Sequence, residues 1–273
     1  LIFSLVAFSI SYFIATLTKL ELVENAILLA FLIHWVLFIP AYLLKTEKFF
    51  DLSGSITYIS VISYVLLFNT STEIRVGSVL LALFIIMWAI RLGSFLFFRI
   101  KKAGEDKRFR EIKTSFFRFF MVWTISGMWV SLCSMCALTA IASNNGVVLN
   151  YLFYFGLVTF FVGMSIEVIS DNQKTQFRKD PKNKDRFINT GLWSRSRHPN
   201  YVGEITLWSG VAIISFSSLE GWQYVSLISP IFTYFLLVYV SGVPQLEESG
   251  QKKWGHMKDY QDYIKKTPSL IFK

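Results

Sequence analysis

Apolar residues along this chain form long blocks that are separated by short polar segments. Eight blocks carry few charges and approach the length of about 20 residues that an α-helix needs to cross a ~30 Å hydrocarbon core. They cover residues 1–18, 22–44, 52–70, 76–98, 117–143, 147–170, 201–218 and 222–245. The pattern predicts an all-α fold, a polytopic membrane helical bundle of about seven to eight transmembrane helices. We expect one integral membrane domain over residues 1–273.

The composition agrees with this pattern. Hydrophobic residues make up 53% of the chain and charged residues 16%, whereas a soluble domain carries about 25% charged residues. The first apolar block lacks the basic flank and the small-residue cleavage site of a signal peptide. We therefore expect it to be a membrane helix.

Lysine and arginine are concentrated in alternate loops. Of the 27 basic residues, 24 fall between the second and third blocks or within 99–118, 174–197 and 252–273. Short basic loops stay in the cytoplasm, so both termini and the segments 99–116, 171–200 and 247–273 are predicted to be cytoplasmic. This topology, with anionic lipid headgroups as partners, accounts for the net charge of +9 without nucleic acid.

Four charged residues fall inside or at the ends of apolar blocks, where a charge is costly and therefore a candidate for function. They are Asp51, Arg91, Glu167 and Glu204. Two of them also have a simpler explanation. Arg91 could extend its side chain to the headgroups, and Glu204 could be stabilised by the dipole of a helix that starts near Pro199.

The stretch "GLWSRSRHPNYVGE", residues 191–204, gathers polar groups directly before an apolar block. A helix N-terminus beside arginines such as Arg197 suits phosphate oxygens. His198 and Asn200 can add directional hydrogen bonds, and Tyr201 adds an aromatic face with a hydroxyl group. Together they predict the binding wall of a nucleotide-type cofactor at the membrane surface.

Two other clusters lie on the same predicted side. Residues 99–113 interleave both signs of charge, a pattern that also fits a solvated amphipathic helix. Glu167, Asp171 and Arg178 share one face if the sixth helix continues beyond the bilayer. Cys133 and Cys136 form a CxxC, but the sequence has no second ligand pair, so we expect them to pack in a helix interface and predict no metal site.

Three stretches resemble one family in type and order: "IRLGSFLFFRIKKAGEDKRF", "GLWSRSRHPNYVGEI" and "WGHMKDYQDYIKKTPSLIF". The family includes the steroid 5α-reductase C-terminal domain and its bacterial relatives, the domain of unknown function 1295. The resemblance extends over most of residues 45–273. It implies NADPH bound from the cytosolic side and reduction of an activated C=C bond in a steroid- or lipid-like enone. The positions that match cofactor contacts are Asp171, Arg178, Arg186, Asn200, Tyr201 and Glu204, with Arg91 and Arg99 near the phosphates.

The resemblance also has departures. Glu167 stands where the steroid reductases carry an asparagine, and Trp88 stands where they carry a catalytic tyrosine. Asp51 lies near where the family's catalytic acid would fall, and Tyr58, two turns later on the same face, could replace the tyrosine. An acid at the carbonyl oxygen would stabilise the enolate that forms on hydride transfer.

Two other functions remain open from the residues. One is an S-adenosylmethionine-dependent methyltransferase of the isoprenylcysteine or phospholipid type, since such proteins share an RHPxY motif and an acidic–aromatic C-terminal segment. The many arginines favour NADPH, because S-adenosylmethionine has no phosphates. The other is a non-enzymatic lipid-binding or scaffold protein. The resemblance places the chain in a bacterial inner membrane, and the sequence predicts no oligomeric state.

Overall fold

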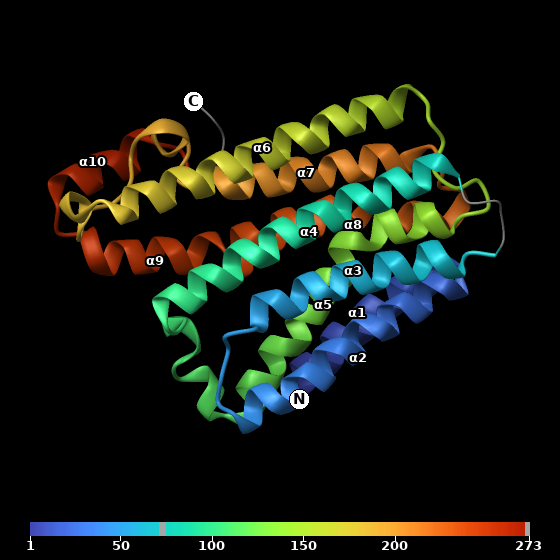
Figure 1. Ribbon diagram of the computed structural model, residues 1–273, viewed down its shortest axis with the longest axis horizontal. Helices are drawn as coiled ribbons and strands as arrows, with labels where there is room; N and C mark the ends of the chain where they lie inside the picture. Colours follow the sequence, from blue (N-terminus) through green and yellow to red (C-terminus); the bar gives the residue numbers. More distant parts are fainter. Residues whose placement is uncertain (71–74, 271–273) are drawn as a thin grey trace. The chain divides into compact units, whose positions relative to one another are not determined.

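The computed structural model describes residues 1–70 and 75–270, apart from the side chain of Lys107, so the last three residues of the predicted segment 247–273 lie outside the described part. Helices dominate, and the described residues contain no β-strand, which confirms the all-α prediction. The helices are α1 (Ile2–Leu17), α2 (Glu21–Leu43), α3 (Phe50–Phe68), α4 (Val76–Ala103), α5 (Phe116–Ala142), α6 (Tyr151–Lys179), α7 (Pro199–Phe216), α8 (Ile228–Phe235), α9 (Val243–Trp254) and α10 (Lys258–Lys266) (Figure 1).

Six helices within the described residues are long and apolar enough to cross a membrane. They are α2, α3, α4, α5, α6 and the helical run Gly221–Trp254, which contains α8, a π-helical turn and α9. The other two predicted spans are also helical. However, α1 has only 16 residues, and the first turns of α7 carry the polar Asn200 and Glu204, so neither is among the six.

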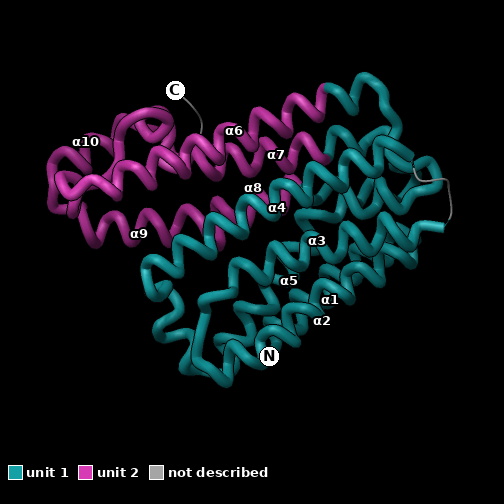
Figure 2. Tube along the Cα trace, viewed as in Figure 1, with its two compact units in different colours: residues 1–154, 212–229 teal, residues 155–211, 230–273 magenta. Residues whose placement is uncertain are grey.

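The chain divides into two compact units, coloured separately in Figure 2. The first unit consists of residues 1–154 and 212–229, and the second of residues 155–211 and 230–273. Both units are discontinuous in sequence, because the chain leaves the first unit within α6 and returns within α7.

In the first unit α5 is the central helix, and α1, α2 and α3 all pack against it. Its side chains are largely buried, including both cysteine thiols. Cys136 Sγ donates a hydrogen bond to the carbonyl of Ser226 at 2.8 Å. This is the helix-interface packing expected for the CxxC pair.

An aromatic cluster closes one end of this unit, around Phe38, Phe109, Phe119 and Trp123. Trp123 is fully buried and packs edge-on against Phe50 in the first turn of α3, with ring centroids 5.3 Å apart. Such apolar contacts fasten the segment between α4 and α5 to the start of α3.

In the second unit α6 and α7 approach so closely that their backbones touch. A methyl group at Gly203 would lie 2.6 Å from the backbone nitrogen of Glu167, and one at Gly210 would lie 2.6 Å from that of Phe160. Glycine is required at both positions, since any side chain would separate the helices. The seam brings the start of α7 against the polar end of α6.

Candidate functional site

The "RHPNY" motif forms the turn that leads into α7, which begins at Pro199. A proline suits this first helical position because its missing N–H would have no partner there. The preceding residues are held by the end of the chain: the backbone N–H of Arg197 donates to the carbonyl of Pro268 at 3.0 Å, and that of His198 to Ser269 at 3.1 Å. The motif is therefore fixed by residues that follow it by about seventy positions.

Glu247, in α9, joins the two basic residues of the motif. Its Oε1 lies 2.8 Å from Nε2 of His198 and 3.1 Å from Nε of Arg197. Arg197 also donates through its terminal nitrogen to the carbonyl of Ile264 at 3.2 Å. The guanidinium that we expected to hold a phosphate therefore also binds Glu247 and the C-terminal segment.

Beside this group, Tyr201 stacks on the ring of His198, with centroids 5.7 Å apart and planes inclined by 12°. Two polar atoms here are buried without a hydrogen-bond partner among the described residues: Oδ1 of Asn200 and Nδ1 of His198. Buried polar groups in proteins nearly always have partners. The motif therefore presents an amide oxygen and a ring nitrogen that a bound molecule could satisfy.

The predicted acidic face of α6 is present. The helix continues to Lys179, which confirms that Glu167, Asp171 and Arg178 lie close to one face. Glu167 is 3% exposed, and its backbone touches Gly203, the residue before Glu204, which is 9% exposed. Two buried glutamates thus lie at or next to the helix seam, whereas Arg178 and Arg186 are exposed.

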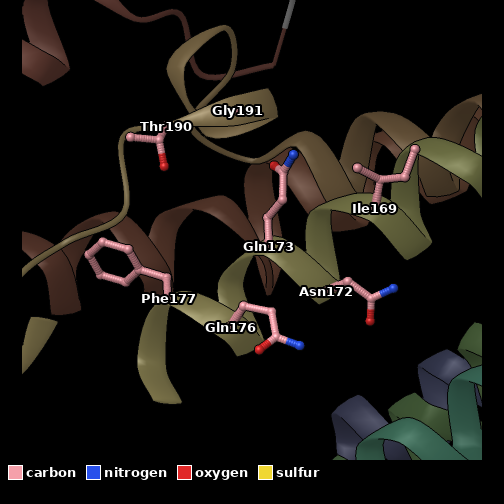
Figure 3. Close-up of a pocket in the computed structure, with 7 residues that line it drawn as sticks. All are labelled: Ile169, Asn172, Gln173, Gln176, Phe177, Thr190 and Gly191. Atoms are coloured by element: carbon pink, nitrogen blue, oxygen red, sulfur yellow. The ribbon is translucent and has the colours of Figure 1, made fainter. Parts of the chain in front are cut away.

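A pocket of about 480 Å³ lies on the opposite face of the same end of α6 (Figure 3). Gln173 helps to shape it, because its Oε1 accepts a hydrogen bond from the backbone of Leu192 at 3.0 Å. None of the residues expected to bind the cofactor lines this pocket. Its lining consists of Ile169, Asn172, Gln173, Gln176, Phe177, Thr190 and Gly191.

The remaining predicted residues belong to the first unit. Asp51 is half-buried in the first turn of α3, and Arg108, Arg99 and Asp106 are the charged groups that act on it most strongly. Tyr58 is 4% exposed and packs edge-on against Trp88, with ring centroids 5.2 Å apart. The tyrosine that could replace the missing family residue is thus in contact with the tryptophan at that position.

Arg91 and Arg99 follow each other along α4 by eight residues, which is slightly more than two turns. Arg91 is half-buried, and Arg99 is exposed near the end of the helix, where its guanidinium lies 5.9 Å from the ring of Phe95. Their expected role beside cofactor phosphates stays a prediction.

Sequence reasoning missed several residues that shape this site. Tyr263 donates its hydroxyl to the carbonyl of Trp193 at 2.6 Å, and burial raises its pKa. Burial and the charge of Glu247 also raise the pKa of Tyr260, which outweighs the opposing effect of Arg197. The acidic–aromatic composition of residues 245–260 is a signal in the sequence for this part of the chain, and it does not say which partners these side chains bind.

These features define a helical membrane protein with a polar cluster at one end of its α6–α7 pair. The chain belongs to the family described as "Protein of unknown function (DUF1295)", whose model matches residues 37–267. The family predicted from the three motifs is therefore confirmed.

Two curated relatives carry different activities in their names. The chain is 27% identical over 173 residues to "Probable O-methyltransferase ustE" of Ustilaginoidea virens, which covers 55% of this chain and 58% of that protein. It is 28% identical over 119 residues to "3-oxo-5-alpha-steroid 4-dehydrogenase 1" of Bos taurus, covering 44% and 41%. The chain thus spans about half the length of the relatives it matches. No solved structure matches it.

Proposed function

We propose that this protein is a membrane-embedded, NADPH-dependent reductase of an activated C=C bond in a steroid- or lipid-like enone. The observation that carries the proposal is the buried Oδ1 of Asn200, which has no hydrogen-bond partner among the described residues and lies beside a cluster of arginine, histidine and carboxylate groups. An amide or hydroxyl group of a cofactor would donate a hydrogen bond to this oxygen. The partial similarity to a steroid dehydrogenase supports the reductase assignment.

The side chains around the motif fit such a molecule chemically. Carboxylates accept hydrogen bonds from ribose hydroxyls or an amide, which suits Glu167, Asp171 and Glu204. Guanidinium groups bind phosphate oxygens with two parallel hydrogen bonds, which suits the exposed Arg178 and Arg186. The stacked rings of Tyr201 and His198 offer a flat apolar wall.

When bound, NADPH supplies the hydride that is added to the β-carbon of the enone. In our proposal the protein's own part is at the carbonyl oxygen, where negative charge develops. Asp51 holds a proton there by hydrogen bonding and transfers it as the charge develops. Tyr58, packed against Trp88, orients the enone with a second hydrogen bond from its hydroxyl.

The setting of this chemistry is a bilayer. An apolar enone dissolved among membrane lipids would reach Asp51 at the start of a membrane helix. We place the protein in a bacterial inner membrane with its cofactor on the cytoplasmic side, as the distribution of basic residues predicts.

The test is isothermal titration of the detergent-purified protein with NADPH, with NADH and S-adenosylmethionine as controls. We expect micromolar binding of NADPH, and weaker binding by about tenfold or more in Asn200→Ala, because a lost hydrogen bond to a desolvated partner costs ~1–3 kcal/mol. Asn172→Ala is the matched control, since it removes the same carboxamide from the pocket on the other face of α6. An effect at Asn172 alone would move the site to that pocket.

A second candidate function is methyl transfer from S-adenosylmethionine, and the similarity to a probable O-methyltransferase favours it. In that case the partnerless Asn200 Oδ1 would accept a hydrogen bond from the ligand's α-ammonium or ribose instead. S-adenosylmethionine needs no phosphate contacts, so Arg178→Met would leave the affinity for S-adenosylmethionine unchanged. The same substitution would weaken the binding of NADPH. Binding of S-adenosylmethionine alone in the same titration would replace our first proposal with this one.

A further inference from the structure

A buried carboxylate outside the site described above joins two parts of the first unit. Glu47 lies in the loop between α2 and α3, and its side chain is only 2% exposed. Its Oε1 accepts a hydrogen bond from the backbone N–H of Asp106 at 2.9 Å, and its Oε2 accepts one from Nζ of Lys113 at 2.7 Å. Its own carbonyl accepts the N–H of Phe50, the first residue of α3, at 2.9 Å.

Glu47 therefore holds the segment that connects α4 to α5, residues 104–115, against the start of α3. We call the two contacts of Glu47, with Asp106 and with Lys113, the clamp. Both partners lie in a segment that has two short 3₁₀ turns and no α-helix. A buried ion pair of this kind needs good geometry, because both charges lose water when they are buried. The exposed pair in the same segment, Arg110 with Glu105, has no such cost and little effect on stability.

The clamp determines where Arg108 lies. Asp106, whose N–H is bound by Glu47, accepts the Arg108 guanidinium at 2.5 Å and 3.0 Å. The next residue, Phe109, packs on Phe50 with ring centroids 4.9 Å apart, and Phe50 precedes Asp51. The contact between Phe109 and Phe50 thus brings the neighbouring Arg108 and Asp51 into the same region, where the positive charge of Arg108 acts on the Asp51 carboxyl.

We propose that Glu47 is a positioning residue that fixes the 104–115 segment so that the Arg108 guanidinium stays beside Asp51. The assignment rests on the proposed function, in which Asp51 transfers a proton to the substrate. Loss of that proton leaves a carboxylate in a half-buried place, and a cation held nearby stabilises it. The enol then gains a proton from water at its α-carbon and loses its O–H proton to water, and Asp51 is reprotonated from cytoplasmic water after the product leaves, so one hydride and one proton are added to the C=C bond.

The experiment compares Glu47→Gln with Glu105→Gln, the same change at the exposed pair of the same segment. Neither change adds or removes a lysine or arginine, so trypsin sees the same cleavage sites within 104–115. We expect cleavage of this segment in detergent to rise about tenfold in Glu47→Gln, because the charged hydrogen bond to Lys113 is lost. Glu105→Gln is expected to stay within about twofold of the unaltered protein.

Turnover tests the positioning role separately. With NADPH and a 3-oxo-4-ene steroid as probe, Glu47→Gln should lower kcat about tenfold while the NADPH affinity measured by titration stays within about twofold. In an Arg108→Met background the same change should lower kcat far less, because both substitutions act through one interaction.

Equal tryptic cleavage of Glu47→Gln and Glu105→Gln would overturn the clamp itself. Faster cleavage with unchanged kcat, or full additivity with Arg108→Met, would overturn the positioning role. Absence of NADPH binding and turnover in the unaltered protein would refute the proposed function, and with it the link between Glu47 and the reaction. The proteolysis result would still decide whether Glu47 holds the segment, so the two failures are distinguishable.

Discussion

The contact between α6 and α7 leads to a sharp prediction at Gly203. In Gly203→Ala, the added methyl carbon would lie 2.6 Å from both the backbone nitrogen of Glu167 and the carbonyl oxygen of Gly163. Carbon atoms in proteins essentially never approach that closely, and backbone atoms cannot move aside by changing a rotamer. The helices must therefore separate, at the cost of ~1–3 kcal/mol typical of an overpacked interior.

Gly54 provides the matched control. It lies in the second turn of α3, and a methyl group added there would meet nothing within 4 Å. Gly54→Ala should therefore be neutral or stabilise the protein by up to ~1 kcal/mol, since alanine favours helix more than glycine does. A Gly→Ala substitution is thus expected to lower stability at Gly203 and to leave it unchanged or raise it at Gly54.

The assay is equilibrium unfolding in mixed micelles with increasing denaturing detergent, followed by tryptophan fluorescence. Gly203→Ala should shift the transition to lower detergent, and Gly54→Ala should leave it unchanged or raise it. Gly203→Ala should also weaken the binding of the proposed cofactor, because it displaces the buried carboxylates of Glu167 and Glu204. A Gly203→Ala protein as stable as the unaltered one would refute the close helix contact.

Three more predictions concern charged groups. Glu247→Gln should lower the free energy of unfolding by ~1–3 kcal/mol, because Glu247 contacts both Arg197 and His198. Glu248→Gln removes only an exposed ion pair, so it should change the free energy of unfolding by no more than ~0.5 kcal/mol. Equal losses in the two variants would contradict this assignment. Burial opposes ionisation of Asp106, but the hydrogen bonds and charge of Arg108 outweigh it and hold the pKa of Asp106 below its usual value. This stabilisation is complete above about pH 4 and is lost as pH falls through the lowered pKa. Acid should therefore promote acid-protease cleavage of residues 104–115, and Asp106→Asn should lessen that pH dependence. Asp51→Asn should lower turnover far more than NADPH affinity, and equal turnover by both proteins would remove Asp51 from the mechanism.

The helical architecture was predictable because hydropathy is a local property. Each apolar block is determined by residues that are adjacent in the chain, and each one became a helix. The number of membrane-spanning helices was harder to predict, because two of the predicted spans, α1 and α7, differ from the other six. The first helix is short, and α7 begins with polar residues of the candidate site, so these two predicted spans are not among the six helices that are both long and apolar enough to cross a membrane.

The candidate site was predictable only in part, for the same reason. The "RHPNY" motif and the acidic face of α6 depend on neighbouring residues and on helix periodicity, which a sequence displays directly. The partner of His198 is 49 positions away, and the carbonyl that fixes the backbone of Arg197 is even farther along the chain. No local pattern identifies which acid in "QLEESG" reaches the motif.

The membrane helices, the family and the list of polar groups that a site could use can all be read from the residues in order. Which of these groups meet depends on the fold: Glu247 contacts Arg197 and His198, and Glu47 contacts Lys113. The fold also decides that α6 and α7 touch at Gly203. The physical reason is that burial and pairing of charges depend on how distant segments fold together, whereas helix formation in an apolar block depends on the block itself.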